Sequence, residues 1–279
     1  MWVSTAAKKP FFLSLIIWLI ISIFSFILHP LQPFQSIAHR GASFYAPENT
    51  MAAFQKAVDL GFDFIEFDVR LSKDGHLVVI HDADVQRTTD GVGYIGDLTV
   101  QEIKMLDAGS WYSPEFSNER IPLLEDVLKQ FGGKIGLLID MKSSENQPQL
   151  TKVLSDILMR YIDNGVKPST LKVQSFNINE IKKFHELTPT ISSGILLEKP
   201  LNILHFETYR KFASFLSVNH HLLSKSIIHQ AKQYGFDIFS WTIKKQYQFQ
   251  IMQRLGVNGI ISDEECKESN SNLLTLIFQ

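Results

Sequence analysis

Cysteine is almost missing from this sequence, since Cys266 is the only one among 279 residues. A lone thiol excludes an intrachain disulfide framework and a thiolate metal cluster within one chain. An excess of positive charge is missing too, because 27 Lys and Arg face 29 Asp and Glu, for a formal net charge of −2. This balance gives no basic surface, so we expect no nucleic-acid partner. These numbers leave the oligomeric state open.

Charged residues are absent from residues 11–28, where three serines are the only interruptions of an apolar run. A helix of this length spans about 27 Å, close to the hydrocarbon thickness of a bilayer. Lys8 and Lys9 precede the run, and the next basic residue is Arg40, so the positive-inside rule places the N-terminus in the cytoplasm. We therefore expect a short flank at 1–10, a single-pass transmembrane anchor at 11–29, a linker at 30–35 and an extracytoplasmic domain after it.

A cleaved signal peptide is the alternative to an anchor, and it would leave the rest of the chain secreted. The apolar run is longer than the core of a usual signal peptide, and residues 29–33 offer no small-x-small cleavage pattern. A helix buried inside a soluble protein is disfavoured, because the run is apolar all round instead of on one face.

Residues 36–279 have the length and the alternation of a single α/β barrel. Short apolar runs that predict strands alternate with amphipathic stretches that predict helices. The turn at Lys73-Asp74-Gly75 predicts a hairpin, whose returning strand at 77–80 adds to the eight others. We expect a (β/α)8 TIM-type barrel with a small insertion at about 87–120, after the strand that leads to His81. The eight predicted strands are 36–38, 62–71, 135–140, 171–175, 192–197, 214–218, 238–242 and 259–262.

Two carboxylates alternate along the predicted strand 62–71, at Glu66 and Asp68. Side chains two residues apart on a strand point to the same face, so the apolar residues that alternate with them take the helix-covered face. Carboxylates held side by side inside a barrel repel each other unless a cation lies between them. Oxygen ligands favour Mg²⁺ or Ca²⁺, with Mn²⁺ also possible, over zinc. The pattern therefore predicts one bound divalent cation.

Two histidines flank these carboxylates along the chain. His39 ends the first predicted strand and continues into Arg40-Gly41, where a guanidinium and a permissive backbone suit a phosphate group. The predicted hairpin brings His81 roughly opposite Asp68. Paired across a cation, the two imidazoles can serve as general acid and general base, and the sequence does not assign which is which. We expect the other seven histidines on the surface or in the core.

Six short motifs follow one another at set separations between residues 39 and 89. In this order they resemble the glycerophosphodiester phosphodiesterase family, whose barrel is shared with phosphatidylinositol-specific phospholipases C. The resemblance extends to about Asp263. It implies that Glu66 and Asp68 bind metal, that His39 and His81 are the acid–base pair, and that Arg40 contacts the phosphate. The motifs are His39-Arg40-Gly41, Pro47-Glu48-Asn49-Thr50, Glu66-Phe67-Asp68-Val69, Lys73-Asp74-Gly75, His81-Asp82 and Arg87-Thr88-Thr89.

The sequence departs from the family pattern in two places. Asp140-Met141-Lys142 stands where the family has Glu-x-Lys. The resemblance implies that Asp140 is the third metal ligand, through a carboxylate one methylene shorter, and that Lys142 contacts the phosphate. Further on, Trp241-Thr242-Ile243-Lys244 stands where Trp-Thr-Val-Asn is usual. Trp241 is then expected to line the substrate pocket, and Lys244 adds a charge near its rim.

The activity that these features predict is metal-dependent hydrolysis of glycerophosphodiesters to glycerol 3-phosphate and an alcohol such as choline or ethanolamine. The attacking group is water or the neighbouring glycerol hydroxyl. One alternative is a lysophospholipase D-type phosphodiesterase on lysophospholipids, which an anchor beside a membrane would suit. Another is a non-catalytic, membrane-tethered binding module, against which the full set of histidines and carboxylates argues.

Overall fold

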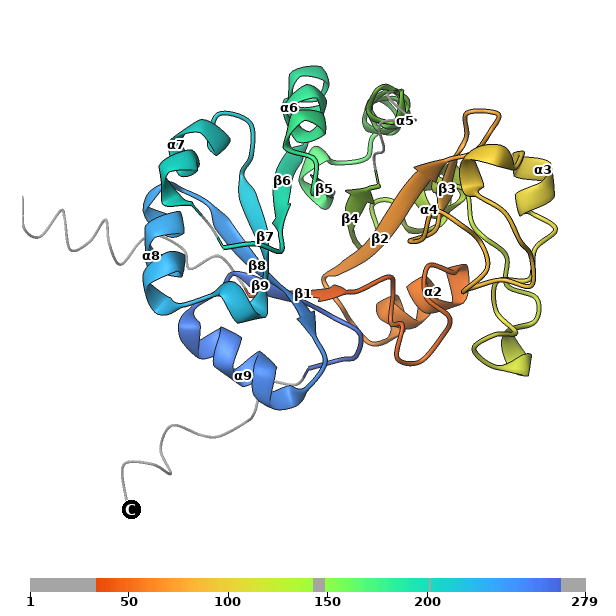
Figure 1. Cartoon of the computed structure of the whole chain (residues 1–279), viewed down its shortest axis with the longest axis horizontal. Helices are drawn as coiled ribbons and strands as arrows, with labels where there is room; N and C mark the ends of the chain where they lie inside the picture. Colours follow the sequence, from red (N-terminus) through yellow and green to blue (C-terminus); the bar gives the residue numbers. More distant parts are fainter. Residues whose placement is uncertain (1–33, 143–148, 201, 267–279) are drawn as a thin grey trace, which may run out of the picture. The chain divides into compact units, whose positions relative to one another are not determined.

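Eight parallel strands form a closed barrel, which confirms the fold class predicted from the sequence. In this computed structural model, β1 (Gln35–Ala38) pairs in parallel with both β2 (Phe64–Leu71) and β9 (Gly259–Ser262), and these pairings close the ring (Figure 1). β3 (Leu77–Val79) is antiparallel to β2, as the hairpin predicts. The remaining barrel strands are β4 (Gly136–Met141), β5 (Leu171–Ser175), β6 (Ser192–Leu197), β7 (Phe215–Asn219) and β8 (Asp237–Ile243).

The structure describes residues 34–142, 149–200 and 202–266. The predicted flank at 1–10, the predicted anchor at 11–29 and most of the predicted linker at 30–35 lie outside these residues. Within the described ranges, no helix has both the length and the apolar character needed to cross a membrane.

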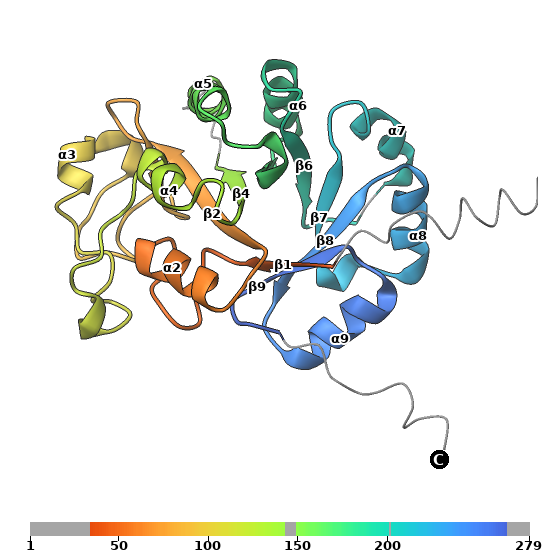
Figure 2. The same ribbon diagram turned by 180° about the vertical axis from the view of Figure 1, so that it is seen from behind.

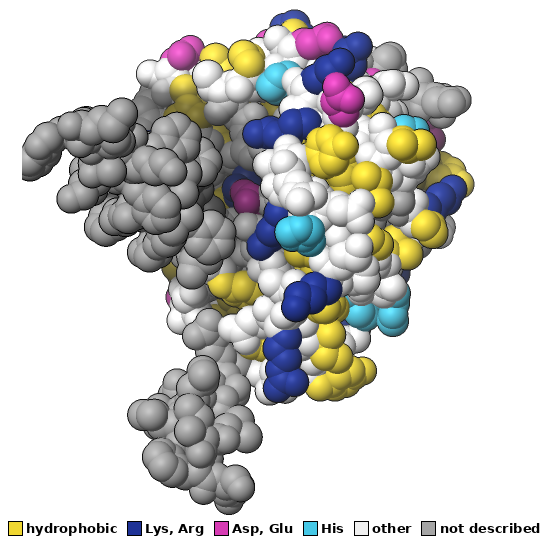
Figure 3. All heavy atoms as spheres, turned by 90° about the vertical axis from the view of Figure 1, so that its left-hand side faces the viewer, with side chains coloured by type: hydrophobic (Ala, Val, Ile, Leu, Met, Phe, Trp, Pro, Cys, Tyr) yellow, Lys and Arg dark blue, Asp and Glu magenta, His cyan; other side chains and the backbone are white. Residues whose placement is uncertain are grey.

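Helices cover the outside of the barrel, as Figures 1 and 2 show from opposite sides. In α4, four residues at helical spacing are buried, namely Leu124, Val127, Leu128 and Phe131. On the side seen in Figure 3, charged and other polar side chains are interspersed with hydrophobic ones. The α-helices are α2 (Met51–Asp59), α3 (Val100–Ile103), α4 (Leu124–Phe131), α5 (Leu150–Asp163), α6 (Ile178–Leu187), α7 (Phe206–Tyr209), α8 (Lys225–Gln233) and α9 (Gln246–Leu255). Short 3-10 turns are η1 (Ile95–Asp97), η2 (Pro114–Phe116), η3 (Pro168–Thr170), η4 (Ile203–His205) and η5 (His220–Leu222).

The barrel is packed on both of its faces. The larger apolar layer lies between the strands and the helices and includes Ile65, Phe67 and Val69 of β2, as the alternation predicts. A smaller layer fills the barrel interior, and Lys172 lies against it with Nζ 5.2 to 5.7 Å from three ring centres. The interior layer consists of Ile37, Phe64, Leu138, Phe215, Phe239 and Ile261.

Between β3 and α4 the chain makes an excursion away from the barrel, and the insertion predicted at about 87–120 falls within it. Seven buried residues, Val78 of β3 and six from the excursion, form a small core separate from the main one. Tyr112 Oη donates a hydrogen bond to the carbonyl oxygen of Phe44 at 2.6 Å, so the excursion is joined to the loop after β1. The seven residues are Val78, Ile80, Val85, Ile95, Ile103, Ala108 and Ile121.

The interior layer predicts the effect of one substitution. Gly194 of β6 pairs in register with Phe215 of β7, and a Cβ at Gly194 would lie 2.1 Å from the Phe215 ring. We expect Gly194→Ala to lower the free energy of unfolding by about 1–3 kcal/mol, measured by urea denaturation. The double variant Gly194→Ala/Phe215→Leu should lose less free energy of unfolding than the two single variants lose in total, because Leu at 215 leaves room for the added methyl group. Strictly additive losses would contradict this packing.

Candidate active site

The candidate site lies where one edge of β2 is not paired with a neighbouring strand. On one edge of β2, β1 pairs with its first two residues and β3 with its last three, which leaves the segment from Glu66 to Asp68 between them. The Gly41 N–H donates to the Glu66 carbonyl oxygen at 3.1 Å, and the Ile80 N–H donates to the Asp68 carbonyl oxygen at 3.0 Å. The two segments that hold the predicted histidines are thereby fixed on either side of the two carboxylates.

Three carboxylates lie together at the carboxyl ends of the barrel strands. Glu66, Asp68 and Asp140 are almost completely buried, with exposed fractions of 3%, 1% and 3%. Asp68 and Asp140 are register partners on β2 and β4. One oxygen from each of the three residues lies within 4.8 Å of the other two. The structure therefore brings together all three residues predicted as metal ligands.

Two positively charged side chains partly neutralise these carboxylates. Lys142 Nζ lies 2.5 Å from Asp140 Oδ2 and 3.0 Å from Asp68 Oδ1. Arg40 Nε lies 3.6 Å from Asp68 Oδ2, and the Arg40 backbone N–H donates to Glu66 Oε2 at 2.9 Å. Both residues were predicted as phosphate contacts, and the structure places both beside the carboxylates.

Burial and the neighbouring charges shift the pKa values of the three carboxylates in different directions. Burial acts to raise the pKa of Asp68, but the charges of Lys142, Arg40 and His81 and the Asn49 hydrogen bond together outweigh burial and leave this pKa below its usual range. Burial raises the pKa of Asp140 to about 6, opposed by Lys142 and supported by the Asp68 charge. Burial and the two neighbouring carboxylates raise the pKa of Glu66 well above its usual value. The negative charge gathered here thus exceeds what the nearby side chains neutralise.

The donor set fits a divalent cation. Asp140 Oδ1 is buried and has no hydrogen-bond partner within the described part of the chain. Carboxylate oxygens are the ligands that Mg²⁺ and Ca²⁺ prefer, and a bound cation relieves like-charge repulsion. The shorter Asp140 side chain, a departure from the family pattern, still reaches the cluster.

Each of the two histidines is held by an aspartate. His39 Nδ1 lies 2.6 Å from Asp263 Oδ1, and His81 Nδ1 lies 2.7 Å from Asp82 Oδ1. Asp82 and Asp263 were not predicted as site residues. Asp82 could have been suspected because it directly follows His81, whereas only closure of the barrel brings Asp263 to His39.

A chain of ion pairs links the His81–Asp82 pair to Arg40. Asp82 Oδ2 accepts from Arg87 Nε at 2.5 Å, and the other two guanidinium nitrogens of Arg87 each lie 2.8 Å from a Glu48 oxygen. Glu48 Oε1 also accepts from Arg40 Nη1 at 2.7 Å. Glu48 and Arg87 stand in motifs quoted from the sequence, but the linear order gives no sign that they pair. The chain of ion pairs fixes His81 and Arg40 relative to each other.

A cavity of about 360 Å³ lies over this cluster. It is lined by all eight residues predicted for the site, together with neighbours from the ends of other strands. Trp241 is fixed in the wall because its Nε1 donates to the Ser217 carbonyl oxygen at 2.9 Å. The lining residues are His39, Arg40, Glu66, Asp68, His81, Asp140, Lys142, Gln174, Phe176, Leu196, Glu198, Trp241, Thr242 and Ile261.

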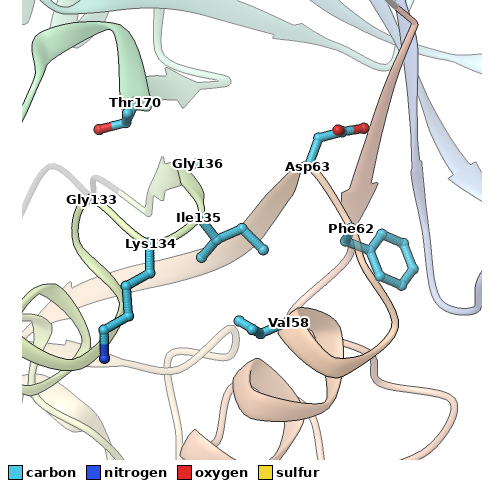
Figure 4. Close-up of a pocket in the computed structure, with 8 residues that line it drawn as sticks. All are labelled: Val58, Phe62, Asp63, Gly133, Lys134, Ile135, Gly136 and Thr170. Atoms are coloured by element: carbon cyan, nitrogen blue, oxygen red, sulfur yellow. The ribbon is translucent and has the colours of Figure 1, made fainter.

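A second hollow of similar size lies at the amino ends of β2 and β4 (Figure 4). Its lining includes Asp63, whose Oδ2 already accepts hydrogen bonds from the Ser36 N–H and hydroxyl. Barrel enzymes carry their chemistry at the opposite, carboxyl ends of the strands. The cavity over the carboxylates is therefore the candidate active site.

Known proteins share the sequence pattern and the fold of this chain. The Glycerophosphoryl diester phosphodiesterase family matches residues 39–265. A putative glycerophosphodiester phosphodiesterase of Bacillus subtilis is 42% identical over 233 residues, covering 81% of this chain and 93% of its own. The chain belongs to this family. Membership confirms the enzyme class predicted from the sequence, a glycerophosphodiester phosphodiesterase, over the non-catalytic module.

Two further proteins are similar to this chain over most of their length. A glycerophosphodiester phosphodiesterase of Caldanaerobacter subterraneus is 37% identical over 234 residues, covering 82% of this chain and 93% of its own. A phosphodiesterase structure from Oleispira antarctica superposes with a TM-score of 0.75 at 30% identity, over 82% of this chain and 92% of that one. That structure is a complex with the product sn-glycerol-3-phosphate.

The carboxylate cluster predicts that a cation stabilises the fold. At about 100 times its dissociation constant, Mg²⁺ or Ca²⁺ should raise the free energy of unfolding by about 2.7 kcal/mol, measured by urea denaturation against an EDTA-treated sample. Asp140→Asn removes one ligand charge at constant size and should reduce this gain. The surface variant Glu207→Gln is the control and should keep it. An equal gain in Asp140→Asn and in the unaltered protein would exclude Asp140 as a ligand.

Proposed function

We propose that this protein hydrolyses glycerophosphodiesters to glycerol 3-phosphate and an alcohol, with a divalent cation and a histidine acid–base pair. One observation carries the proposal: two histidines, each held by an aspartate, line the same cavity as three buried carboxylates. The product-bound relative from Oleispira antarctica supports the substrate class.

In this proposal, His39 and His81 carry out the proton transfers. Because the Nδ1 atoms of His39 and His81 face carboxylates, their Nε2 atoms remain for the substrate. One imidazole takes the proton from the attacking hydroxyl, and the other gives a proton to the oxygen of the leaving alcohol. Asp263 and Asp82 orient the rings and stabilise the imidazolium that forms.

In this proposal, Arg40, Lys142 and the divalent cation bind the phosphate of the substrate. Arg40 Nε is buried and has no hydrogen-bond partner within residues that the structure describes, so a donor is available for a phosphate oxygen. Lys142 offers a second positive charge, and Trp241 contacts the organic part of the substrate. A divalent cation held by Glu66, Asp68 and Asp140 would polarise a nonbridging phosphate oxygen.

Substitution of the histidines tests this assignment. His39→Ala and His81→Ala should each lower kcat on glycerophosphocholine by about 100-fold or more, because each removes one proton transfer. Asp263→Asn should give a smaller loss of kcat with little change in KM, because it removes only the orientation of His39. Release of glycerol 3-phosphate measures the rates.

His229→Ala serves as the control, since His229 lies exposed on α8 and is not among the residues that line the cavity. It should leave the rate unchanged. Wild-type turnover by His39→Ala or by His81→Ala would refute the acid–base pair. Lysophospholipids in the same assay separate a lysophospholipase D from a glycerophosphodiesterase.

We propose further that residues 11–29 anchor the protein in a membrane, with the N-terminus cytoplasmic and the barrel extracytoplasmic. The uncharged run and the lysines that precede it support this topology. A reporter fused after Gln279 should be active only on the extracytoplasmic side. Activity confined to the cytoplasm would overturn the orientation. Recovery of a soluble mature protein that starts after residue 29 would instead show signal cleavage.

A further inference from the structure

A hydrogen bond joins the side chain of Arg70 to the main chain of His81. Arg70 Nε donates to the His81 carbonyl oxygen at 2.9 Å. Arg70 belongs to β2 and follows Asp68 by two residues, so the two side chains share one face of the strand. A proposed proton-transfer residue is thereby tied to the strand that carries two of the candidate metal ligands, Glu66 and Asp68.

This bond lies where the ladder between β2 and β3 ends. The last register pair is Val69 with Val79, and the Ile80 N–H then donates to the Asp68 carbonyl oxygen at 3.0 Å. His81 follows, outside the ladder. Its carbonyl oxygen accepts a hydrogen bond from Arg70 and from no other residue in the described ranges. A side chain therefore takes the place of a partner strand at this point.

The main chain of His39 is held in a different way. Its N–H donates to the Ser262 carbonyl oxygen at 2.8 Å. β1, which ends directly before His39, is paired on one side with β2 and on the other with β9. Strand pairing thus fixes the main chain at His39, whereas the carbonyl of His81 depends on the Arg70 side chain.

The guanidinium of Arg70 is itself held by its surroundings. Arg70 is half-buried, and burial lowers its pKa against the opposing charges of nearby carboxylates. An arginine stays charged near neutral pH all the same, so its planar group remains a donor. Attraction to several carboxylates restricts where this group can lie. The carboxylates whose charges act on it are Asp68, Asp82, Asp84 and Asp140.

We propose that Arg70 is a positioning residue, which holds the main chain of His81 in register with the carboxylates of β2. The proposal rests on the proposed function and deepens it by naming a residue on which one proton transfer depends. Arg70 is not among the residues that line the active-site cavity, so its effect passes through His81. A displacement of a catalytic group by about 1 Å costs on the order of 100-fold in rate.

Substitution of Arg70 tests the proposal at saturating cation. Arg70→Met keeps the length of the side chain and removes its donors, so kcat on glycerophosphocholine should fall about 10- to 100-fold with KM within about threefold. Arg70→Lys retains a charged donor and should recover part of this loss. Arg254→Gln, on the exposed side of α9, is the control and should change neither constant. An unchanged kcat in Arg70→Met would overturn the proposal.

A double-mutant cycle separates positioning from a general effect on the fold or on the cation. Added to His81→Ala, Arg70→Met should lower the residual kcat by less than about twofold, because the group that it positions is gone. Added to Asp263→Asn, which acts on His39, it should keep its full effect. Equal losses in the two backgrounds would contradict a role through His81.

Hydrogen exchange tests the same contact without turnover. In Arg70→Met, the amides of residues 77–86 should exchange about tenfold faster or more, while those of residues 35–41 exchange as in the unaltered protein. Unchanged exchange at 77–86 would refute the positioning role even where hydrolysis is established. Faster exchange confined to 77–86, in a protein that does not hydrolyse glycerophosphodiesters, would refute the proposed function alone.

Discussion

Repulsion among three buried carboxylates is the constraint on which the active site depends. Burial removes the water that would screen Glu66, Asp68 and Asp140 from one another, so their charge must be balanced by groups held close by. Lys142 and Arg40 supply part of that balance, while burial and the neighbouring carboxylates raise the pKa values of Glu66 and Asp140. The divalent cation proposed above would offset the remaining repulsion, and the proposed phosphate site lies at the same cluster.

The barrel positions this cluster through the different lengths of its strands. β1 ends early along β2 and β3 starts late, so the backbone of β2 between them is bonded by Gly41 and Ile80 instead of by a continuous strand. Of the two catalytic candidates, His39 lies two residues before Gly41 and His81 directly follows Ile80. Regular hydrogen bonding thus helps to set the position of the two histidines relative to the carboxylates of β2, in addition to the loops that carry them.

The sequence was sufficient for those parts of the site that local pattern determines. Alternation on one strand predicts that Glu66 and Asp68 share a face, and the strand count predicts that Asp140 ends a strand of the same barrel. Asp263 could not be predicted as the partner of His39, because 224 residues separate them and only the pairing of β1 with β9 brings them together. The Glu48–Arg87 ion pair depends similarly on the fold of the excursion. Side-chain pairs across elements are set by packing, which the linear pattern does not contain.

The two His–Asp dyads are supported in different ways, and this has a consequence for catalysis. Asp82 is bound by Arg87, and Arg87 is bound by Glu48, which also holds Arg40, so the orientation of His81 is tied to that of the proposed phosphate contact Arg40. Asp263 reaches His39 through barrel closure, and the exposed Lys244 lies 4.0 Å from its carboxylate. Loss of Arg87 is therefore expected to disturb the orientation of both His81 and Arg40, whereas loss of the Asp263 carboxylate removes the partner of His39. Each histidine is thus set by a separate structural device, and their roles can be separated by substitution.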